Sequence, residues 1–523
     1  MKQLLIVFFS FFILIATAQE PEQISVKGGN MDFDEAIAPG ATILFGEVIF
    51  THSGATLTCD KAFYYQKENR LKAFGNVKLN QGDTIHLTSK YLEYDGNTKL
   101  AMVNGGVVVS DRKMRLETQK AYFDRKKQTA YYNQEGTIHS DDNVLVSDSG
   151  MYYMYESRYE FVENVQLTNP KYTIDSKKLD YYTDSGEVYL YENTVIKSKE
   201  NTIYCDKGFY DTKNDYSYFT KKARIQSKTR ELFGDSITYD RKNALAKVYQ
   251  NIKVIDTINS TTIKGNYAEM FEKKDSVFIT KRAEIIRRLS QKDSMHIHGD
   301  TILATGKKDF RKVRIFNKVK IFSKDMQAKC DSVFINEQTG MTKLLNDPIL
   351  WAQKSQIVGD TILLLSKEIT KGKKQLDSIK AIDNVFIVQK DSTNTYNQIK
   401  GRLLKGKIIK NELRIVDVIG NSESLYYLRD EKKALIGIDK KACSRINFEL
   451  ENKTITAITY FKTVTGKTIP EDKFPEIEAQ LKGFAWREEE RPKDKNAIFE
   501  ITNTSNKEIT KTVKKPILDE SKK

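Results

Sequence analysis

One short stretch of this chain recurs eleven times at a nearly constant spacing, which limits the fold more than any other feature. The clearest copy runs from Leu57 to Tyr64, and near copies run from Ile203 to Tyr210 and from Leu232 to Tyr239. We take the residue equivalent to Asp60 as the anchor of each copy. Successive anchors lie 29 to 34 residues apart: Asp60, Lys90, Gln119, Asp148, Lys177, Asp206, Asp235, Asn266, Asp300, Asp331 and Asp360. A fixed period in this range indicates a repeat architecture, in which each unit packs on its neighbours.

Apolar residues occupy fixed places around each anchor. The residue three places before it is aliphatic in ten of the eleven copies, and the residue four places after it is aromatic in the first seven. Inward-facing residues alternate with a period of two along a strand, but here the phase is odd before the anchor and even after it. A phase change of one residue is typical of a bulge or bend. We therefore predict that the strand turns a corner at Asp60 and at its equivalents.

A second strand follows a polar turn in each repeat. Its signature is Phe-Gly-Asn-Val at 74–77, and it returns as Glu-Asn-Val at 163–165 and Gln-Asn-Ile at 250–252. Two strands of about nine residues each and two short turns fill one period, which leaves no room for a helix. The repeats thus predict an elongated, open-ended all-β body with a continuous apolar lumen or seam.

The chain divides into five segments by pattern. Residues 1–18 carry the charged start, short apolar run and small-residue end of a cleaved signal peptide, and the alternative of a membrane anchor is disfavoured because the run is short. Residues 19–39 are a lead-in, residues 40–390 carry the repeats, and residues 391–465 continue them in degenerate form, with anchors expected near Arg402 and Ser444. Residues 466–523 form a C-terminal cap and then, from Arg487 onward, a charged tail that we predict to be disordered.

The charge balance favours an anionic partner. The sequence has 85 basic and 70 acidic residues, a formal net charge of +15, although a solvated lysine-rich face that discourages edge-to-edge association explains this equally well. Export disfavours nucleic acid as the partner. Seven basic residues are candidate contacts for lipid phosphates, with a solvated strand face as the alternative: Arg287, Arg288, Lys307, Lys308, Arg311, Lys312 and Arg314.

The sequence favours no enzyme. Cys59, Cys205 and Cys330 each precede an anchor, where other copies carry Ser, Thr or Gly, so we interpret them as small buried thiols rather than as disulfide or metal ligands. His296 and His298 should share one face of a strand, as a metal pair would, but no third ligand lies near them in the sequence. We predict no catalytic residue, metal or cofactor.

The repeats resemble the OstA-like family, which includes the periplasmic protein LptA and the N-terminal domain of LptD. The resemblance rests on the strand Cys59 to Tyr64 alternating with the strand Gly75 to Leu79, and it covers roughly residues 40–390. It implies a twisted β-jellyroll of repeats whose apolar interior shields lipid acyl chains. It also implies stacking of strand edges with other OstA-like jellyrolls in a periplasmic bridge. The chain is longer than one LptA-type domain, and it lacks the C-terminal barrel of LptD.

The expected function is therefore non-enzymatic transport of lipopolysaccharide, or of a related anionic glycolipid, through the periplasm to an outer-membrane LptD-like translocon. The alternative is a repeat-built cell-surface adhesin or glycan-binding scaffold. Each apolar column could also fill a dry core. The candidate lipid-binding columns are Leu57, Tyr64, Leu87, Tyr94, Leu116, Phe123, Leu145, Tyr152, Ile174, Tyr181, Ile203, Tyr210, Leu232 and Tyr239.

Overall fold

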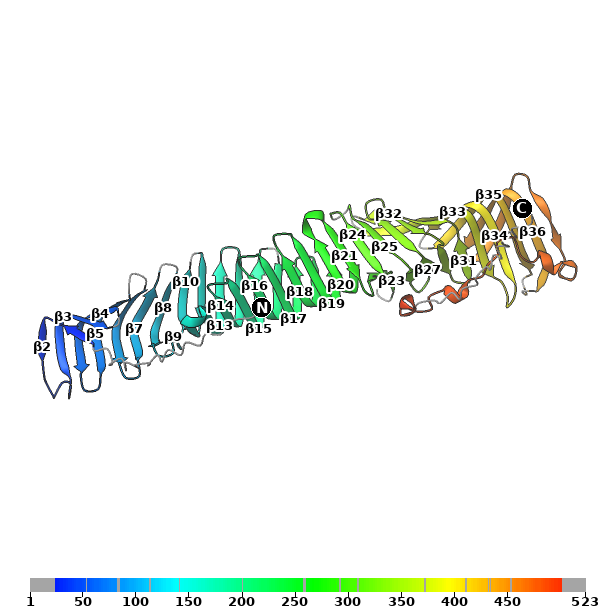
Figure 1. Cartoon of the computed structure of the whole chain (residues 1–523). Coiled ribbons are helices and arrows are strands. Elements are labelled where there is room, and N and C mark those ends of the chain that lie inside the picture. The colour runs from blue at the N-terminus through cyan, green and yellow to red at the C-terminus, as the bar shows by residue number, and fades with distance from the viewer. Residues whose placement is uncertain are drawn as a thin grey trace, which may run out of the picture. The chain divides into compact units, whose positions relative to one another are not determined.

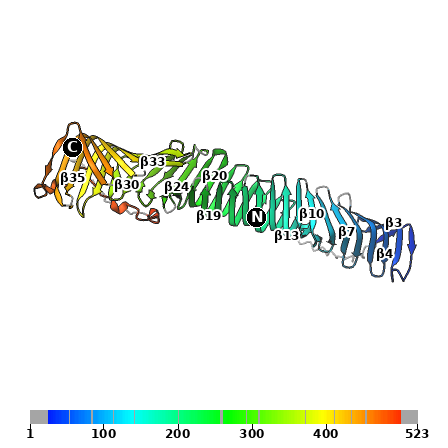
Figure 2. The ribbon, with the colours of Figure 1, turned by 180° about the vertical axis from the view of Figure 1, so that it is seen from behind.

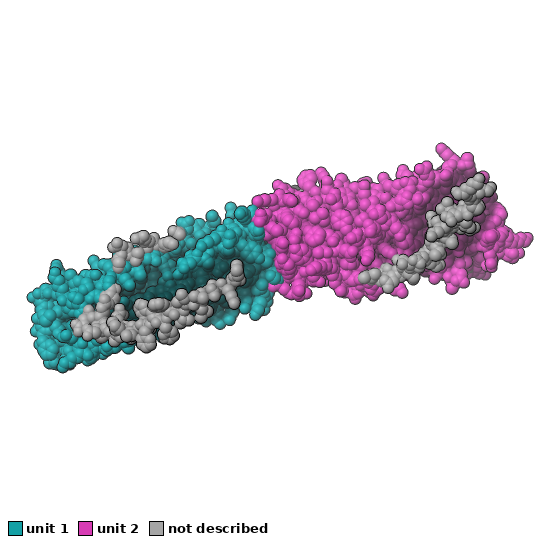
Figure 3. Space-filling model, in the orientation of Figure 1, with its two compact units in different colours: residues 1–228, 236–242 teal, residues 229–235, 243–523 magenta. Residues whose placement is uncertain are grey.

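The structure is a computed structural model that describes residues 24–500, except 53, 82–84, 112–113, 141, 200, 257–259, 291–292, 308–309, 371–372, 410–411, 431, 433 and 452–453. The predicted signal peptide and the part of the predicted tail beyond residue 500 lie outside the described residues. The chain forms two compact units, which Figure 3 colours separately. Unit 1 comprises residues up to 228 together with 236–242, and unit 2 comprises 229–235 and the residues from 243 onward. The segment boundaries predicted from the sequence remain predictions.

Unit 1 is built almost entirely of strands. These are β1 (Ser25–Lys27), β2 (Asn30–Asp32), β3 (Thr42–His52), β4 (Ala55–Tyr65), β5 (Arg70–Gln81), β6 (Ile85–Asp95), β7 (Leu100–Ser110), β8 (Met114–Asp124), β9 (Thr129–Tyr132), β10 (Gly136–Ser140), β11 (Asn143–Ser147), β12 (Ser149–Tyr153), β13 (Arg158–Asn169), β14 (Tyr172–Tyr182), β15 (Glu187–Ser198), β16 (Asn201–Asp211) and β17 (Tyr216–Ser227), with the 3₁₀ turn η1 (Met154–Glu156). Residues of β18 (Arg230–Asp240) belong to both units.

Unit 2 continues the same pattern. Its strands are β19 (Leu245–Asp256), β20 (Thr261–Phe271), β21 (Ser276–Thr280), β22 (Glu284–Arg288), β23 (Ser294–His298), β24 (Thr301–Thr305), β25 (Lys312–Phe316), β26 (Val319–Phe322), β27 (Gln327–Cys330), β28 (Ser332–Asn336), β29 (Met341–Leu345), β30 (Ile349–Ala352), β31 (Ser355–Val358), β32 (Thr361–Thr370), β33 (Lys373–Lys390), β34 (Tyr396–Ile409), β35 (Glu412–Arg429), β36 (Leu435–Glu451), β37 (Thr454–Phe461) and β38 (Thr465–Ile469). Its 3₁₀ turns are η2 (Glu272–Lys274), η3 (Glu471–Lys473), η4 (Glu476–Glu478), η5 (Glu488–Glu490) and η6 (Ala497–Phe499).

The strands form an antiparallel meander in which each long strand pairs with the one before it and the one after it, as for β13 to β17 in unit 1 (Figure 1). Unbroken strands of unit 1 such as β4 and β5 have 11 and 12 residues, longer than the predicted nine, because the strand continues through the corner. The predicted all-β jellyroll-type fold is confirmed.

The predicted corners are present. In β4, Thr58 pairs with Lys78 of β5 and Lys61 pairs with Phe74, so the register shifts across Asp60. The same shift falls on Lys177 in β14, between Asp175 and Lys178. Register shifts also occur around Arg402 and Ser444, where degenerate anchors were expected.

The backbone irregularity lies on the second strand of most repeats rather than at the anchor, and opposite Gln119 the second strand is instead broken between β9 and β10. Two consecutive residues with positive φ oppose one anchor residue, as Glu192 (φ 51°) and Asn193 (φ 50°) of β15 oppose Lys177. This is a bulge in which two residues face one, and it bends both strands. Thirteen such pairs occur among the described residues: 46–47, 75–76, 105–106, 163–164, 192–193, 221–222, 250–251, 281–282, 317–318, 346–347, 383–384, 420–421 and 462–463.

A polar ladder links these corners. The second residue of the pair is often Asn, whose Nδ2 donates to the anchor Asp of the preceding strand: 2.9 Å from Asn76 to Asp60, 2.7 Å from Asn164 to Asp148, and 2.8 Å from Asn251 to Asp235. Asparagine and glycine tolerate left-handed φ better than other residues do. The Gly-Asn-Val signature in the sequence is therefore the signature of the corner.

Each corner divides a strand between two layers. The first layer contains the residues before each anchor, and the second layer contains the residues after it. Side chains from both layers meet on the inside, as in one cluster that joins Leu57 and Leu79 of the first layer with Leu71 and Tyr64 of the second. The core of each unit lies between the layers and is deepest at the corner.

In unit 2 a C-terminal strap, residues 470–500, crosses the outer face of the first layer (Figures 1 and 2, orange to red). The Nε2 of Gln356 donates to the carbonyl oxygen of Ala485 at 2.8 Å, and its Oε1 accepts from the N–H of Arg487 at 2.8 Å. Gln398 makes the same pair of bonds to Ala479 and Leu481. The side chain of each buried glutamine thus bonds one backbone carbonyl and one backbone N–H of the strap, as a neighbouring strand would.

The strap corrects part of the tail prediction. Arg487 lies within the predicted disordered tail, yet its guanidinium binds both carboxylate oxygens of Asp347 at 2.8 Å each. Lys320, which is buried, donates to the carbonyl oxygen of Glu500 at 2.7 Å. Residues 487–500 are fixed because the sheet supplies partners for their charges and backbone, which composition alone does not reveal.

Alanine substitutions at two corner glycines, Gly75 and Gly106, should destabilise the protein to different extents. Gly75 (φ 71°) and Gly106 (φ 66°) both need left-handed φ, but a Cβ would strike the Asp60 side chain only at Gly75, since open space surrounds Gly106. Gly106→Ala should cost about 1 kcal/mol from φ alone, and Gly75→Ala should cost clearly more. Urea denaturation of the two variants measures the difference, and equal losses would contradict the close approach of the corner to the Asp60 carboxylate.

Candidate functional site

The sequence-predicted columns all lie on strands whose alternation points them between the layers. Those three places before an anchor lie in the first layer, and those four places after it lie in the second. One cluster of unit 1 includes Leu57, Tyr64, Leu87 and Tyr94, and a second includes Leu116, Leu145, Ile174 and Tyr181. Phe123, Tyr152, Ile203, Tyr210, Leu232 and Tyr239 occupy the equivalent positions and are half-buried.

Most side chains of the lining are less buried toward the open side, which we call the mouth, than at the corner. At the corner, Ala62 and Leu92 are 0% and 2% exposed. Toward the mouth, Leu87, Tyr94 and Leu116 are half-buried, whereas Leu57, Leu145 and Ile174, at the position equivalent to Leu87, are buried. Figure 3 shows the visible face of unit 1 hollowed along its length. Unit 1 thus combines a dry corner with an apolar lining that water reaches from one side.

The two layers touch across this interior at a few places. The rings of Phe50 in the first layer and Tyr64 in the second have centroids 6.2 Å apart. Nearer the mouth, the hydroxyl of Tyr159 in the second layer donates to the Sδ of Met114 in the first at 2.9 Å. These contacts show how close the layers come, and methionine is the side chain that adapts most easily to a change of neighbour.

Sequence reasoning missed half of the lining. The second strand of each repeat contributes its own inward residues, including Leu79, Val109 and Leu167 in the first layer and Tyr159 and Val188 in the second. The Asn-Val signature could have located them, because this valine faces inward and so does every second residue after it, as Val77 and Leu79 do. The interior is therefore lined by both strands of a repeat rather than by the first strand alone.

The lining carries little charge. Burial raises the pKa of Tyr64 and Tyr152, and it raises that of Tyr210 to about 12, helped by a hydrogen bond from its hydroxyl to Asp215. At the corner, the Oγ of Ser176 bonds the Oγ1 of Thr194 at 2.9 Å and the carbonyl oxygen of Lys178 at 2.9 Å. The tyrosines stay neutral at physiological pH. The surface that faces the mouth therefore consists of aliphatic side chains and uncharged tyrosine rings with their hydroxyl groups.

The structure does not bring the basic residues into one cluster. Arg287 and Arg288 belong to β22 in the first layer, and Lys312 and Arg314 belong to β25 in the second. Lys312 and Arg314 are exposed and alternate with buried Val313 and Ile315, so they form a solvated outer face. Lys307 is exposed in the preceding turn, Arg311 is half-buried just before β25, and Lys308 lies outside the described residues.

The cysteines are the buried thiols that the sequence indicated. Cys59, Cys205 and Cys330 are free and buried, and burial raises their thiol pKa values to about 11, 12 and 12. Cys443 is a fourth of the same kind, directly before the corner at Ser444. These thiols resist ionisation and so lack the reactivity of catalytic cysteines.

The His296–His298 pair lies on one strand, β23, and Glu284 supplies a neighbour from β22 that was not apparent from the sequence. The Nδ1 of His296 lies 2.8 Å from the Oε1 of Glu284, and the Nδ1 of His298 lies 2.7 Å from the carbonyl oxygen of Ala283. Across the described ranges, no group of three or more His, Cys, Asp or Glu side chains is arranged to hold a metal ion. The pair is explained by local hydrogen bonding.

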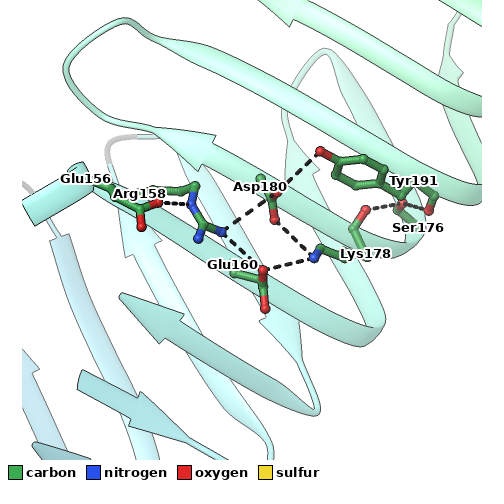
Figure 4. A network of polar contacts seen from close by, with 7 residues as sticks. All are labelled: Glu156, Arg158, Glu160, Ser176, Lys178, Asp180 and Tyr191. Carbon is green, nitrogen blue, oxygen red and sulfur yellow. Dashed lines mark hydrogen bonds and ion pairs between the residues drawn. The ribbon is translucent and has the colours of Figure 1, made fainter. Parts of the chain in front are cut away.

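A charged network covers part of the outer face of the second layer in unit 1 (Figure 4). Arg158 contacts Glu160 at 3.1 Å and Asp180 at 3.9 Å, and Lys178 contacts the same two carboxylates at 2.9 and 3.9 Å. Burial raises the pKa of Asp180, and its Oδ1 has no hydrogen-bond partner. For Glu160, hydrogen bonds from Lys178 and Arg158 outweigh the effect of burial and lower the pKa.

A cavity of about 410 Å³ lies at the far end of unit 2, against β36, β38 and the strap. Its lining includes Lys440, Lys441, Glu423 and Glu478, and Lys440 pairs with Glu478 at 2.9 Å. This charged cavity is lined by none of the column residues. No helix within residues 24–500, as far as they are described, is long and apolar enough to cross a bilayer.

Residues 24–177 match the model of the family described as OstA-like protein. This segment is similar to the OstA-like family. The resemblance inferred from the repeats is confirmed there, and the later repeats lie outside the match.

Among solved structures, the chain is similar to LptH of Pseudomonas aeruginosa, described as the LptA-homologous periplasmic component of the lipopolysaccharide transport device. The identity is 14% and the TM-score 0.13, over 32% of this chain and 80% of LptH. A likeness at that score carries no argument about function. No curated protein matches the sequence.

The charged network of Arg158, Glu160, Lys178 and Asp180 leads to a prediction about the pH dependence of stability. Because burial raises the folded-state pKa of Asp180, its ionisation destabilises the fold as pH rises through its unfolded value of about 3.9. Asp180→Asn should therefore gain stability relative to the unsubstituted protein between pH 3.5 and pH 7. Urea denaturation at both pH values measures this gain.

Glu160→Gln is the matched control, because the folded-state pKa of Glu160 is lowered and its charge stabilises the fold above the unfolded value. This variant should lose stability over the same pH interval. If both variants lose stability at pH 7, the account of Asp180 as a desolvated carboxyl is wrong.

Proposed function

We propose that this protein is a non-enzymatic carrier of an acylated lipid of the cell envelope, with lipopolysaccharide as the expected cargo, and that it acts in the periplasm. The observation that carries the proposal is the apolar lining on both layers of unit 1, which is mostly half-buried toward the mouth and dry at the corner. A closed core would bury these side chains, and an ordinary surface would not align them over successive strands.

The chemistry of this lining suits acyl chains. Each methylene that leaves water contributes about 0.8 kcal/mol, and aliphatic and tyrosine side chains from the two layers face each other across the gap. Leu87 and Tyr94 belong to one such cluster, and Leu116 and Tyr181 to another. A fatty chain laid along the mouth would meet successive repeats at equivalent points.

The OstA-like match of residues 24–177 supports lipopolysaccharide as the lipid and other OstA-like jellyrolls and an outer-membrane LptD-like translocon as partners. Strand β3 is covered by β1 over residues 49–51 and by β2 over residues 43–45, so a partner at this end of unit 1 would pair with the outer edges of these two three-residue strands. The predicted signal peptide supports export.

The test is photo-crosslinking of lipid to side chains that face the interior between the two layers and to one that faces outward. A photoreactive phenylalanine analogue replaces Leu87 or Tyr94, which are inward and half-buried, or Thr88, which is the exposed neighbour of Leu87. The protein is exported in a lipopolysaccharide-producing bacterium, irradiated and probed for lipopolysaccharide adducts. We expect adducts from positions 87 and 94 and none from 88, because only the first two line the gap.

Absence of any lipid adduct from positions 87 and 94, together with lipid-free purified protein, would reject the carrier. Retention of a lipid-free glycan under the same conditions would instead favour the adhesin or glycan-binding scaffold.

A further inference from the structure

The interior of unit 2 changes character along its length. Leu232, Ile263 and Ile285 in the first layer are half-buried, as in the hollow of unit 1. The next inward residues along the layer are sealed: Ile297 is 7% exposed and Ile321 is 2% exposed. The accessible lining of unit 2 therefore ends between β22 and β23.

Basic side chains lie at the mouth where that lining ends. In the first layer, Thr261 pairs with Asp256 on one side and Arg287 on the other, so the three form a row across neighbouring strands. Arg230 joins this row through a contact of 3.4 Å between its Nε and the Oδ2 of Asp256. By strand alternation, Arg287 shares the inward face of Ile285 at the end of β22.

The second layer adds cations from the opposite side. The N–H of Glu337 donates to the carbonyl oxygen of Arg311 at 3.0 Å, which fixes the two turns together. The Nζ of Lys374 donates to the backbone carbonyl oxygens of Glu337 and Gln338. Loss of solvation raises the pKa of the Glu337 carboxyl, against the opposing effect of Arg311, Arg287, Lys374 and Arg230. Cations of both layers therefore act on this one carboxyl.

Two of these guanidinium groups are open to solvent, since Arg287 is exposed and Arg311 is half-buried. Within the described part of the chain, the side chains of Arg287 and Arg311 make no hydrogen bond or ion pair, whereas Arg230 contacts Asp256. An unpaired arginine presents a planar fork of donors that matches the oxygens of a phosphate or carboxylate. Their placement beside the last accessible apolar residues adds a second requirement, because the ligand must also have an apolar part.

We propose that Arg287 and Arg311 bind the anionic headgroup of a lipid whose acyl chains lie against Leu232, Ile263 and Ile285. This inference rests on the proposed carrier function and specifies the headgroup chemistry as phosphate or carboxylate. It replaces the seven-residue run of the sequence prediction by two of its members, supported by Arg230 and Lys374. Lys312 and Arg314 face outward and take no part.

The experiment compares two lipids with identical acyl chains, phosphatidic acid and diacylglycerol, each bearing a fluorescent acyl label and presented to the full chain in detergent. Phosphatidic acid should bind the unsubstituted protein more tightly. Arg287→Gln and Arg311→Gln should each weaken phosphatidic acid by about tenfold, since each removes a charge-assisted contact, and should leave diacylglycerol unchanged. Arg288→Gln, next to Arg287 on β22, and Arg314→Gln, on β25 just after Arg311, are the controls and should change neither affinity.

Glu337→Gln provides a variant whose effect cannot come from misfolding. Removing the carboxylate on which both arginines act should increase the affinity for phosphatidic acid, and the increase should grow as pH rises and more of that carboxyl is ionised. Unchanged binding in all three variants, with both lipids still bound, would overturn the headgroup site and leave the carrier function standing. Failure of the unsubstituted protein to bind either lipid would overturn the carrier function itself.

Competition with inorganic phosphate shows whether the site binds a lipid phosphate or the free ion. Millimolar phosphate should displace phosphatidic acid only weakly, because it lacks the apolar part. If phosphate binds as tightly as phosphatidic acid and depends equally on Arg287, the site recognises the free ion and the lipid assignment is wrong.

Discussion

The bulge that opposes two left-handed residues to one anchor residue is the constraint on which the rest of the structure depends. Two consecutive residues with positive φ are costly for L-amino acids, yet the pair recurs from 46–47 to 462–463. Asn76 and Asn164 reduce that cost by donating to Asp60 and Asp148 across the corner. Without the bend each strand would be straight, the meander would be a flat sheet, and its apolar face would have nothing to pack against. The corner therefore makes two layers out of one sheet, and the gradient of burial from corner to mouth follows from it.

Much of this fold could be predicted from the sequence because the repeat displays it many times. The phase change around Asp60 located the corner, and the small residues before each anchor indicated close packing there, which the buried Cys59 and Ser147 bear out. What the sequence did not show was which strand holds the left-handed pair, because Glu192 and Lys222 are poor markers of positive φ. The strap was equally hidden. Its contacts depend on Gln356 and Gln398 meeting residues more than eighty positions away, and no local pattern records such a distance.

The candidate site was predictable in kind but not in detail. The columns through Leu87 and Tyr94 are where alternation put them, but alternation cannot say how much of each side chain water reaches. The basic run illustrates the opposite error. Arg311 and Lys312 are neighbours in sequence, but β25 begins at Lys312, whose side chain faces outward. Arg287 and Arg311 are far apart in sequence, yet both act electrostatically on the carboxyl of Glu337. Charge clustering in this fold depends on rows across strands rather than on runs along them.

The central claim is that the half-buried lining of unit 1 receives acyl chains, and quenching by a lipid with a nitroxide on its acyl chain tests it most directly. Tryptophan is introduced at Leu87, Tyr94 or Thr88 of a chain whose two native tryptophans, Trp351 and Trp486, are replaced by phenylalanine. The account predicts strong, saturable quenching of the tryptophan fluorescence at position 87 in the first layer and at position 94 in the second, and little quenching at position 88. Equal quenching at all three positions, or none at 87 and 94, would mean that the lining is a core and that the lipid is bound elsewhere or not at all.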